Sequence, residues 1–363
     1  MFRLSEHLYP LDEVIASLIQ SIISKKPIDE CLFWLWEMET SINTIADGIT
    51  CIYHLFYAAG NINLDKYLVR KLQAYDNDNN MAHLADVVCA LRVSKPSLHA
   101  YLIWNASQTF TNPTKIYKSP DVNNNDRMMT GLLRAISHKN HTEIGAYLNF
   151  ASKTISPQRI IVALLRHCGV TDVNNNYISL ETHVITGVDI MYVCAVIARI
   201  YDHTGEVKKL FVRASQTIVD EMTHHFSNKC VDDGLQLSYR RKYPTHNIMM
   251  SMIGSDNYYR TTVDLNTACC YSWEYYCFES RRWRNRFEKY GGKQNHTNKS
   301  IEFPNNEHRD AFYNNGNVNL FEQLSDSSKT YSLHSIDVIK DTFQWFETMM
   351  FERLTEKVAC LEV

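Results

Sequence analysis

Apolar side chains recur at intervals of three and four residues along much of this chain, which is the spacing of one helix face. The stripe at the start comprises Leu11, Val14, Ile15, Leu18, Ile19, Ile22 and Ile23. Residues 31–36 are apolar on every side, as expected of a helix that is buried all round. With only 12 glycines and 8 prolines to interrupt these patterns, we predict long helices and an all-α fold.

Three polar segments rich in Asp and Asn separate the helical stretches. They cover residues 76–80, 121–125 and 172–176, so their starts are 45 and 51 residues apart (121 − 76 and 172 − 121). Such periods are typical of stacked helical hairpins like HEAT repeats. The helices between the segments share no evident side-chain pattern, so a non-repetitive bundle is an equal alternative. We therefore expect residues 1–230 to form a HEAT-like helical array or a helical bundle.

The pattern changes after the turn signal at residues 232–234, where we place a domain boundary. Residues 231–363 are predicted to form a smaller helical module. Within it, residues 291–330 are expected to be irregular, apart from a short helix near residues 307–313.

A long amphipathic helix is expected to begin near Ser335, which is a suitable N-cap, and to run towards the end of the chain. Its apolar face is wider than a two-stranded coiled coil requires. The face packs either in the core or against a partner, and a homodimer is one such arrangement. We take Phe343, Phe346 and Met350 as the candidate partner-binding residues.

The charge of the chain is unevenly distributed. The formal net charge is −3, so the chain as a whole is not a basic nucleic-acid binder. Residues 240–299 carry eleven Lys and Arg against five Asp and Glu, whereas residues 300–363 carry five against eleven. The two segments either attract each other or provide a binding surface.

Arginines and aromatic residues are concentrated in the basic segment. Arginine makes bidentate contacts with phosphate, and tryptophan stacks on bases. The same spacing is typical of an ordinary amphipathic helix whose arginines face solvent or pair with the acidic segment, and both alternatives stay open. The candidate nucleic-acid-binding residues are Arg240, Arg241, Lys242, Arg281, Arg282, Trp283, Arg284 and Arg286.

No local motif in the sequence indicates catalysis. The 10 cysteines include no Cys-x-x-Cys pair, so we expect buried reduced thiols and a cytoplasmic, reducing location. Glu221 and His224 have the spacing of a di-iron ligand pair, but no second such pair occurs. The longest clean apolar run, residues 190–198, is too short for a membrane span. We predict no catalytic residue, no metal site, no cofactor and no membrane association, although catalytic residues from distant positions would escape such a search.

Two groups of short motifs resemble uncharacterised proteins of large nucleocytoplasmic DNA viruses of the mimivirus-like group. The first comprises residues 28–34 with Glu37, then residues 53–58 and 61–67. The second comprises residues 273–276, Trp283, residues 286–287, 290–291 and 303–305, and residues 312–313. The resemblance implies a viral, cytoplasmic context and no particular mechanism.

Two hypotheses of function follow. The first is a non-catalytic helical scaffold or subunit of a viral multiprotein assembly that binds protein partners. The alternative is an RNA- or DNA-associated factor of the viral factory, such as a translation-initiation or transcription scaffold, which uses the Arg and Trp cluster. Location in the host cytoplasm, in the viral factory or in the virion is left open.

Overall fold

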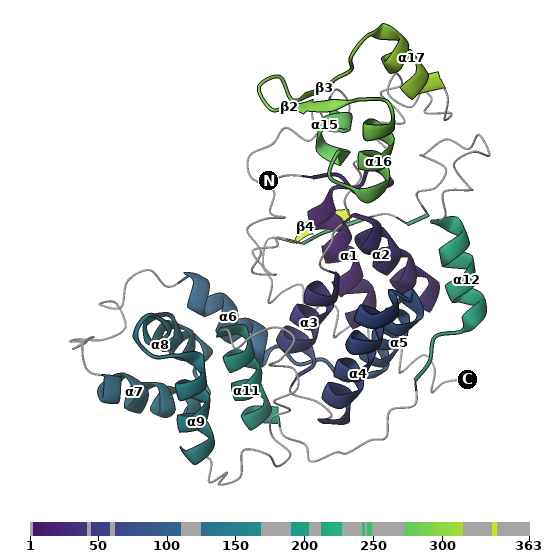
Figure 1. Ribbon diagram of the computed structural model, residues 1–363. Coiled ribbons are helices and arrows are strands. Elements are labelled where there is room, and N and C mark those ends of the chain that lie inside the picture. The colour runs from purple at the N-terminus through teal and green to yellow at the C-terminus, as the bar shows by residue number, and fades with distance from the viewer. Residues whose placement is uncertain are drawn as a thin grey trace. The chain divides into compact units, whose positions relative to one another are not determined.

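A computed structural model of the chain describes residues 3–41, 45–58, 62–109, 125–167, 190–202, 212–226, 242–243, 245–248, 272–314 and 336–339. Contacts group the chain into two compact units. Residues 1–45 and 214–363 form the first unit, and residues 46–213 form the second. Helices make up most of the described residues, so the prediction of an all-α fold is confirmed (Figure 1).

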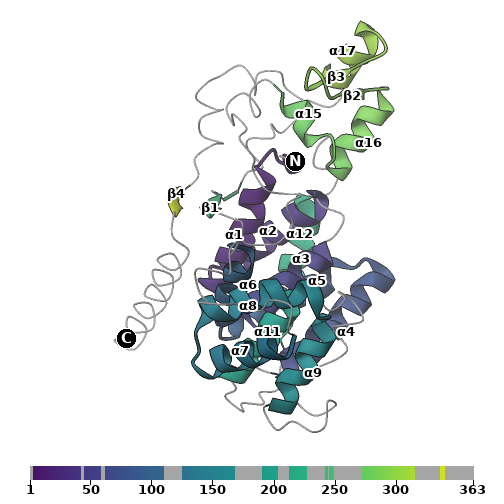
Figure 2. The same ribbon diagram turned by 90° about the vertical axis from the view of Figure 1, so that its left-hand side faces the viewer.

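Three helices of the first unit pack together: α1 (Leu11–Ile23), α2 (Ile28–Ser41) and α12 (Gln216–His225). The apolar stripe of α1 is buried, as its spacing predicts. Residues 31–36 of α2 are buried on every side because α1 and α12 both pack on this helix. Figure 2 shows α1, α2 and α12 lying beside one another.

The remaining elements of the first unit are short. Strand β1 (His246–Ile248) lies beside α1 and pairs in parallel with β4 (Ile336–Ile339). The others are α15 (Trp273–Cys277), α16 (Arg281–Lys289), the antiparallel hairpin of β2 (Lys293–Asn295) and β3 (Ser300–Glu302), and α17 (Asn306–Asn314).

Aromatic side chains form the core that holds α15, α16 and α17 together. The rings of Phe287 and Phe312 stack with centroids 4.7 Å apart, and those of Trp273 and Trp283 meet edge to face at 5.0 Å. Leu4 from the N-terminal segment joins the same buried cluster. The start of the chain is therefore part of this aromatic core.

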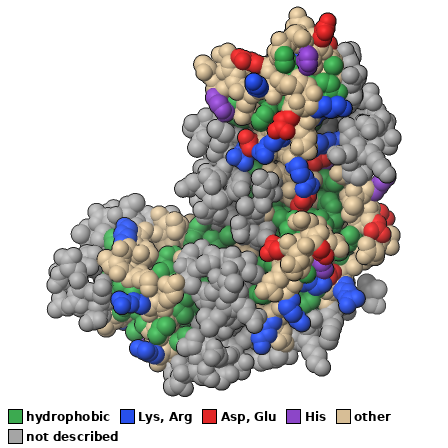
Figure 3. Space-filling view, in the orientation of Figure 1, with side chains coloured by type: hydrophobic (Ala, Val, Ile, Leu, Met, Phe, Trp, Pro, Cys, Tyr) green, Lys and Arg blue, Asp and Glu red, His purple; other side chains and the backbone are tan. Residues whose placement is uncertain are grey.

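The described residues of the second unit form helices joined by short turns and irregular segments, with no strand among them. Its helices are α3 (Ile45–Phe56), whose first residue belongs to the first unit, α4 (Ile62–Asp78), α5 (Met81–Val93), α6 (His99–Thr109), α7 (Asn125–Ser137), α8 (His141–Thr154), α9 (Pro157–His167) and α11 (Ile190–Asp202). α4 packs on α5, and α8 packs against α6 and α7. α11 packs against α6 and α9. On the face drawn in Figure 3, Lys and Arg side chains gather over α4.

Helices α6 and α8 approach each other closely at Gly145. A Cβ atom at this position would lie 2.4 Å from the Cβ of Ala106 and 2.7 Å from the carbonyl oxygen of Ile103. Only a residue without a side chain fits between the two helices here. Asn140 caps α8 by accepting a hydrogen bond from the backbone N–H of Glu143 at 3.2 Å.

A buried ion pair links α11 to the helices before it in the second unit. Nη2 of Arg199 donates to the hydroxyl oxygen of Tyr53 at 2.5 Å and lies 3.4 Å from Oδ1 of Asp65. Its Nε atom donates to the carbonyl oxygen of Ala58 at 2.5 Å. Burial raises the pKa of the Tyr53 hydroxyl, which therefore stays neutral beside Asp65.

The structure differs from the predicted polar segment at residues 76–80. Helix α4 continues to Asp78, so the connection shrinks to Asn79 and Asn80. Asn79 takes a left-handed backbone conformation (φ 52°), and Asn80 caps α5 by accepting from the N–H of Ala82 at 3.0 Å. Nearly all of the other two predicted polar segments lies outside the described residues, so the repeat spacing stays a prediction.

The prediction of a helix that starts near Ser335 is wrong at its beginning. Residues 336–339 form β4, whose isoleucines and valine are β-branched and suit a strand paired with β1. Phe343, Phe346 and Met350 lie outside the described residues. The segment predicted to be irregular contains the β2–β3 hairpin and α17, the second of which agrees with the predicted short helix.

The two compact units divide the chain differently from the predicted domains 1–230 and 231–363. Residues 1–45 group with residues 214–363, and the N-terminal segment is hydrogen-bonded to these later elements. The N–H of Leu4, for example, donates to the carbonyl oxygen of Tyr276 at 2.9 Å. Among the described residues, no helix has the length and apolar character that crossing a bilayer demands.

Candidate functional site

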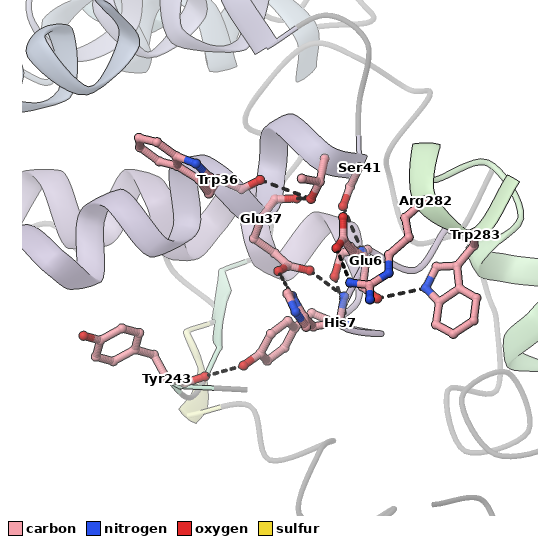
Figure 4. Close-up of polar contacts among 11 residues, drawn as sticks. Glu6, His7, Trp36, Glu37, Ser41, Tyr243, Arg282 and Trp283 are labelled. Carbon is pink, nitrogen blue, oxygen red and sulfur yellow. Dashed lines mark hydrogen bonds and ion pairs between the residues drawn. The ribbon is translucent and has the colours of Figure 1, made fainter. Parts of the chain in front are cut away.

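The N-terminal segment, residues 3–10, brings polar groups of the first unit together against α2 and α16 (Figure 4). The segment folds back on itself. The N–H of Ser5 donates to the carbonyl oxygen of Tyr9 at 2.8 Å, and the N–H of Tyr9 donates to Oγ of Ser5 at 3.0 Å. Leu8 takes a positive φ of 63°, which closes the turn and presents Glu6 and His7 to the helices.

His7 and Glu37 form a buried pair at the centre of the site. The N–H of His7 donates to Oε1 of Glu37 at 2.9 Å, and Nδ1 of His7 lies 2.5 Å from Oε2. Both side chains are 0% exposed. The ring of Phe226 meets the His7 ring edge to face at 5.0 Å and closes one side.

The environment of Glu37 favours its ionised form. Burial alone raises the pKa of a carboxyl group, but the charge and hydrogen bonds of His7 outweigh burial here. The pKa of Glu37 is therefore lowered from its ordinary value of 4.5.

A second pair joins the N-terminal segment to α16. Nη1 of Arg282 donates to Oε1 of Glu6 at 2.6 Å, with side chains that are 11% and 3% exposed. The indole N–H of Trp283 donates to the carbonyl oxygen of Glu6 at 2.9 Å. The N–H of Glu6 donates to Oγ of Ser41 at the end of α2, at 3.0 Å. Glu6 is thus bound through its side chain, its carbonyl oxygen and its amide.

Tyr243 and Thr245 are held against α1 and α2 by further hydrogen bonds. The hydroxyl of Tyr243 donates to Oδ2 of Asp29, and this hydrogen bond is the main cause that lowers the pKa of Asp29. Oγ1 of Thr245 donates to Oε2 of Glu13 at 2.6 Å. The hydroxyl of Tyr9 donates to the carbonyl oxygen of Tyr243 at 3.0 Å.

The outer edge of α16 carries weaker, partly exposed pairs. Arg281 lies 3.1 Å from Oε2 of Glu39, with side chains that are 61% and 14% exposed. Burial raises the pKa of Glu39, and Arg281 only partly offsets this effect. Arg284 pairs with Glu279 at 2.5 Å, and both side chains are about one third exposed.

The structure disfavours base stacking by Trp283, which was one of the two alternatives left open by the sequence. Its ring is 2% exposed and packs on Trp273 and Phe287, so it offers no free face on which a base could stack. Arg282 is turned inward to Glu6. Arg286 donates to the carbonyl oxygen of Phe312, and its guanidinium lies 4.9 Å from the centroid of that ring.

The carboxylates that pair with this cluster also differ from the expected ones. Glu6, Glu39 and Glu279 bind the arginines, and all three precede the acidic segment 300–363 in the chain. Lys242 is 44% exposed and lies 3.5 Å from Asp29. Arg240 and Arg241 lie outside the described residues.

Sequence reasoning missed His7 and Glu37, and only the second left a signal. A carboxylate next to the apolar run of α2 indicates a buried partner, because an ionised group is rarely buried alone. Nothing in the sequence around His7 points to Glu37, which is 30 residues away. The contact exists only because the N-terminal segment folds onto α2.

A hydrogen-bonded histidine and carboxylate can serve as a general base where a substrate reaches the imidazole. Here both side chains are fully buried, and Phe33 and Phe226 pack around the ring. The geometry therefore supports a structural role for the pair. Within the part of the chain that the structure describes, no three His, Cys, Asp or Glu side chains are grouped to hold a metal ion.

Comparison of the chain with protein-family models, curated proteins and solved structures finds no match. The function is therefore argued from the geometry of the chain itself.

Proposed function

We propose that this chain is a non-catalytic helical subunit of a viral multiprotein assembly, which presents a rigid surface to protein partners in the host cytoplasm or viral factory. The observation that carries the proposal is the fully buried His7–Glu37 pair, which links the N-terminal segment to α2. The viral context rests on the motif resemblance alone.

Closed polar pairs suit a rigid binding surface better than a reaction centre. Removing one partner of a buried pair costs several kcal/mol, so such pairs hold one arrangement of the chain against alternatives. His7 with Glu37 and Arg282 with Glu6 fix the N-terminal segment between α2 and α16 of the first unit. The charges of these four side chains therefore pair with one another within the first unit.

The exposed side of α16 is the surface that we assign to a protein partner. Trp283 and Phe287 face the core, while Arg281, Asn285, Glu288 and Lys289 are exposed. Arginine is enriched at the centres of protein interfaces, and a mixed polar rim around it is typical of such surfaces.

The proposal is tested by measuring, from its elution, the native mass of the tagged chain in an extract of infected cells. We expect the tagged chain to elute in a complex of fixed composition, larger than a single chain. Arg281→Glu is expected to shift the chain to its single-chain mass, because the substitution reverses the charge of an exposed arginine on the proposed surface. Arg309→Glu, which changes a 53% exposed arginine on α17, is the matched control and should leave the complex intact. Elution of the unaltered chain alone would contradict the proposal.

Nucleic-acid binding is the alternative that exposed Arg281 leaves in place. It predicts that the chain retains a single-stranded RNA, that retention falls steeply between 50 and 200 mM salt, and that Arg281→Glu reduces it. The scaffold proposal predicts no retention that depends on Arg281.

A further inference from the structure

A pocket of about 780 Å³ lies in the second unit, bordered by α4, the start of α5 and residues 212–213. This volume is within the range of roughly 300–1,000 Å³ that is typical of small-molecule sites. Its lining is basic, with Arg70, Lys71, His83 and Arg213, and Tyr67 and Ala74 complete the side formed by α4. Figure 3 shows Lys and Arg side chains gathered over this helix.

Two of the four basic groups lie beside carboxylates. Nζ of Lys71 lies 2.6 Å from Oδ2 of Asp86, and Nε2 of His83 lies 3.0 Å from Oδ2 of Asp78. Both contacts join α5 to α4.

The two arginines differ from the other basic groups. Nε of Arg70 donates to the carbonyl oxygen of Lys66 at 3.1 Å, which fixes the direction of the side chain without neutralising it. Among the described residues, no carboxylate lies within ion-pair distance of Arg70 or Arg213. Within the described lining, the positive charge that is not paired therefore comes from these two guanidinium groups.

Tyr67 holds one wall of the pocket in place. Its hydroxyl donates to the carbonyl oxygen of Val212 at 2.5 Å, so the residue next to Arg213 is tied to α4. Burial raises the pKa of Tyr67 to about 12, and the hydroxyl remains a neutral donor. The backbone beside Arg213 is thus held against α4 by a contact that does not use the charge of Arg213.

We propose that this pocket binds a phosphorylated small molecule, whose phosphate oxygens accept hydrogen bonds from the guanidinium groups of Arg70 and Arg213. The planar guanidinium presents paired N–H donors that match two phosphate oxygens, and such charge-assisted bonds are strong. The pocket is larger than one phosphate group, so the rest of the ligand lies against the apolar atoms of Ala74 and Val212. The pocket is independent of α16 and of the proposed protein interface.

Titration calorimetry of the full chain with pyrophosphate at constant ionic strength tests this inference. We expect saturable binding that weakens about tenfold or more in Arg70→Ala and in Arg213→Ala, because each removes charge-assisted hydrogen bonds. Lys95→Ala removes an exposed cation of the same unit outside the pocket and should bind as the unaltered chain does. Arg70→Lys keeps the charge but loses the paired donors, so its affinity should be intermediate.

The same titrations contain the results that would overturn the inference. It fails if pyrophosphate shows no saturable binding, or if Lys95→Ala weakens binding as much as Arg70→Ala does, since this would indicate a diffuse charge effect. It also fails if a single-stranded RNA binds through Arg70 while pyrophosphate does not, since the pocket would then be part of a nucleic-acid surface. Circular dichroism of each variant confirms that the helices are retained.

Discussion

In the first unit, the surroundings of each carboxylate determine whether its charge is buried and paired or lies near the surface. Glu6 and Glu37 are bound at several atoms each and are almost fully buried, whereas Glu39 lies at the edge with an exposed arginine. The contribution of each carboxylate to the free energy of unfolding therefore depends on how deeply it is buried. It also depends on how much removing the carboxylate would destabilise its buried partner. The number of ion pairs alone does not give this contribution.

Glu37→Gln should destabilise the chain much more than Glu39→Gln, its matched control two residues along α2. We expect a loss of about 3 kcal/mol in the free energy of unfolding for Glu37→Gln, because His7 keeps its place in a buried site without a carboxylate. The loss for Glu39→Gln should stay below about 1 kcal/mol, because Arg281 is largely exposed. Urea unfolding followed by circular dichroism measures both, and equal losses would refute the assigned roles.

The contribution of Glu37 should also depend on pH. Folding lowers the pKa of this carboxyl group below 4.5, so its ionised form stabilises the native state fully above about pH 4.5. That stabilisation is lost as the pH falls through the lower, folded-state pKa. The difference in unfolding free energy between the unaltered chain and Glu37→Gln should therefore narrow below pH 4.5, as urea titrations at pH 7, 5 and 3.5 can show. A gap that widens on acidification would have the wrong sign.

At the scale of elements, the hydrophobic pattern predicts the helices well and their partners poorly. The stripe of α1 and the all-round apolar run of α2 are both buried as expected. The aromatic positions between residues 273 and 313 that carry the motif resemblance meet in one core around Phe287 and Phe312. Their spacing in sequence does not disclose this meeting.

The hydrophobic pattern did not predict the short strands and turns, and the reason is physical. β2, β3 and β4 have three or four residues each, which is too short for alternation to distinguish a strand from a loop. β4 depends on its pairing with β1, whose partner residues lie about 90 positions earlier, and such long-range pairing leaves no local signal in the sequence.

The close contacts of α8 with α6 and α7 give a prediction for two glycines. In Gly145→Ala the new methyl group meets backbone atoms of α6, including the amide of Ser107 at 2.7 Å, so the helices must separate. We expect a loss of about 1–3 kcal/mol in unfolding free energy. In Gly131→Ala the methyl group meets only the ring end of Tyr147, which can move, and the loss should be smaller. Thermal unfolding of both variants compares them, and a larger loss for Gly131→Ala would contradict the packing described.

At the scale of the whole molecule, the order of the chain hides its organisation. The chain leaves the first unit after Ile45 and returns to it at Ala214. A boundary inferred from changes in residue composition does not reveal this return, because composition is a local signal. The contacts of residues 3–10 with α16, in contrast, join residues more than 270 positions apart.

Prediction from the sequence meets the same limit at the proposed site on α16. The sequence indicated the arginine cluster of α16, but the side of the helix that each residue faces was decided by the aromatic core beneath it. Stacking of Trp283 on bases was one of two alternatives that the sequence left open, and the structure instead places this ring in the core.

Hydrogen exchange of residues 3–10 tests the central claim most directly, because the proposed rigid surface requires the His7–Glu37 pair to stay closed. The amide of His7 donates to Glu37 at 2.9 Å within a fully buried pair, so it should exchange only when the first unit unfolds. We predict protection of this amide comparable to that of the centre of α2, and loss of that protection in Glu37→Gln. Exchange of the His7 amide as fast as in an unstructured peptide would show that the segment opens freely, and the account of a closed, non-catalytic platform would be contradicted.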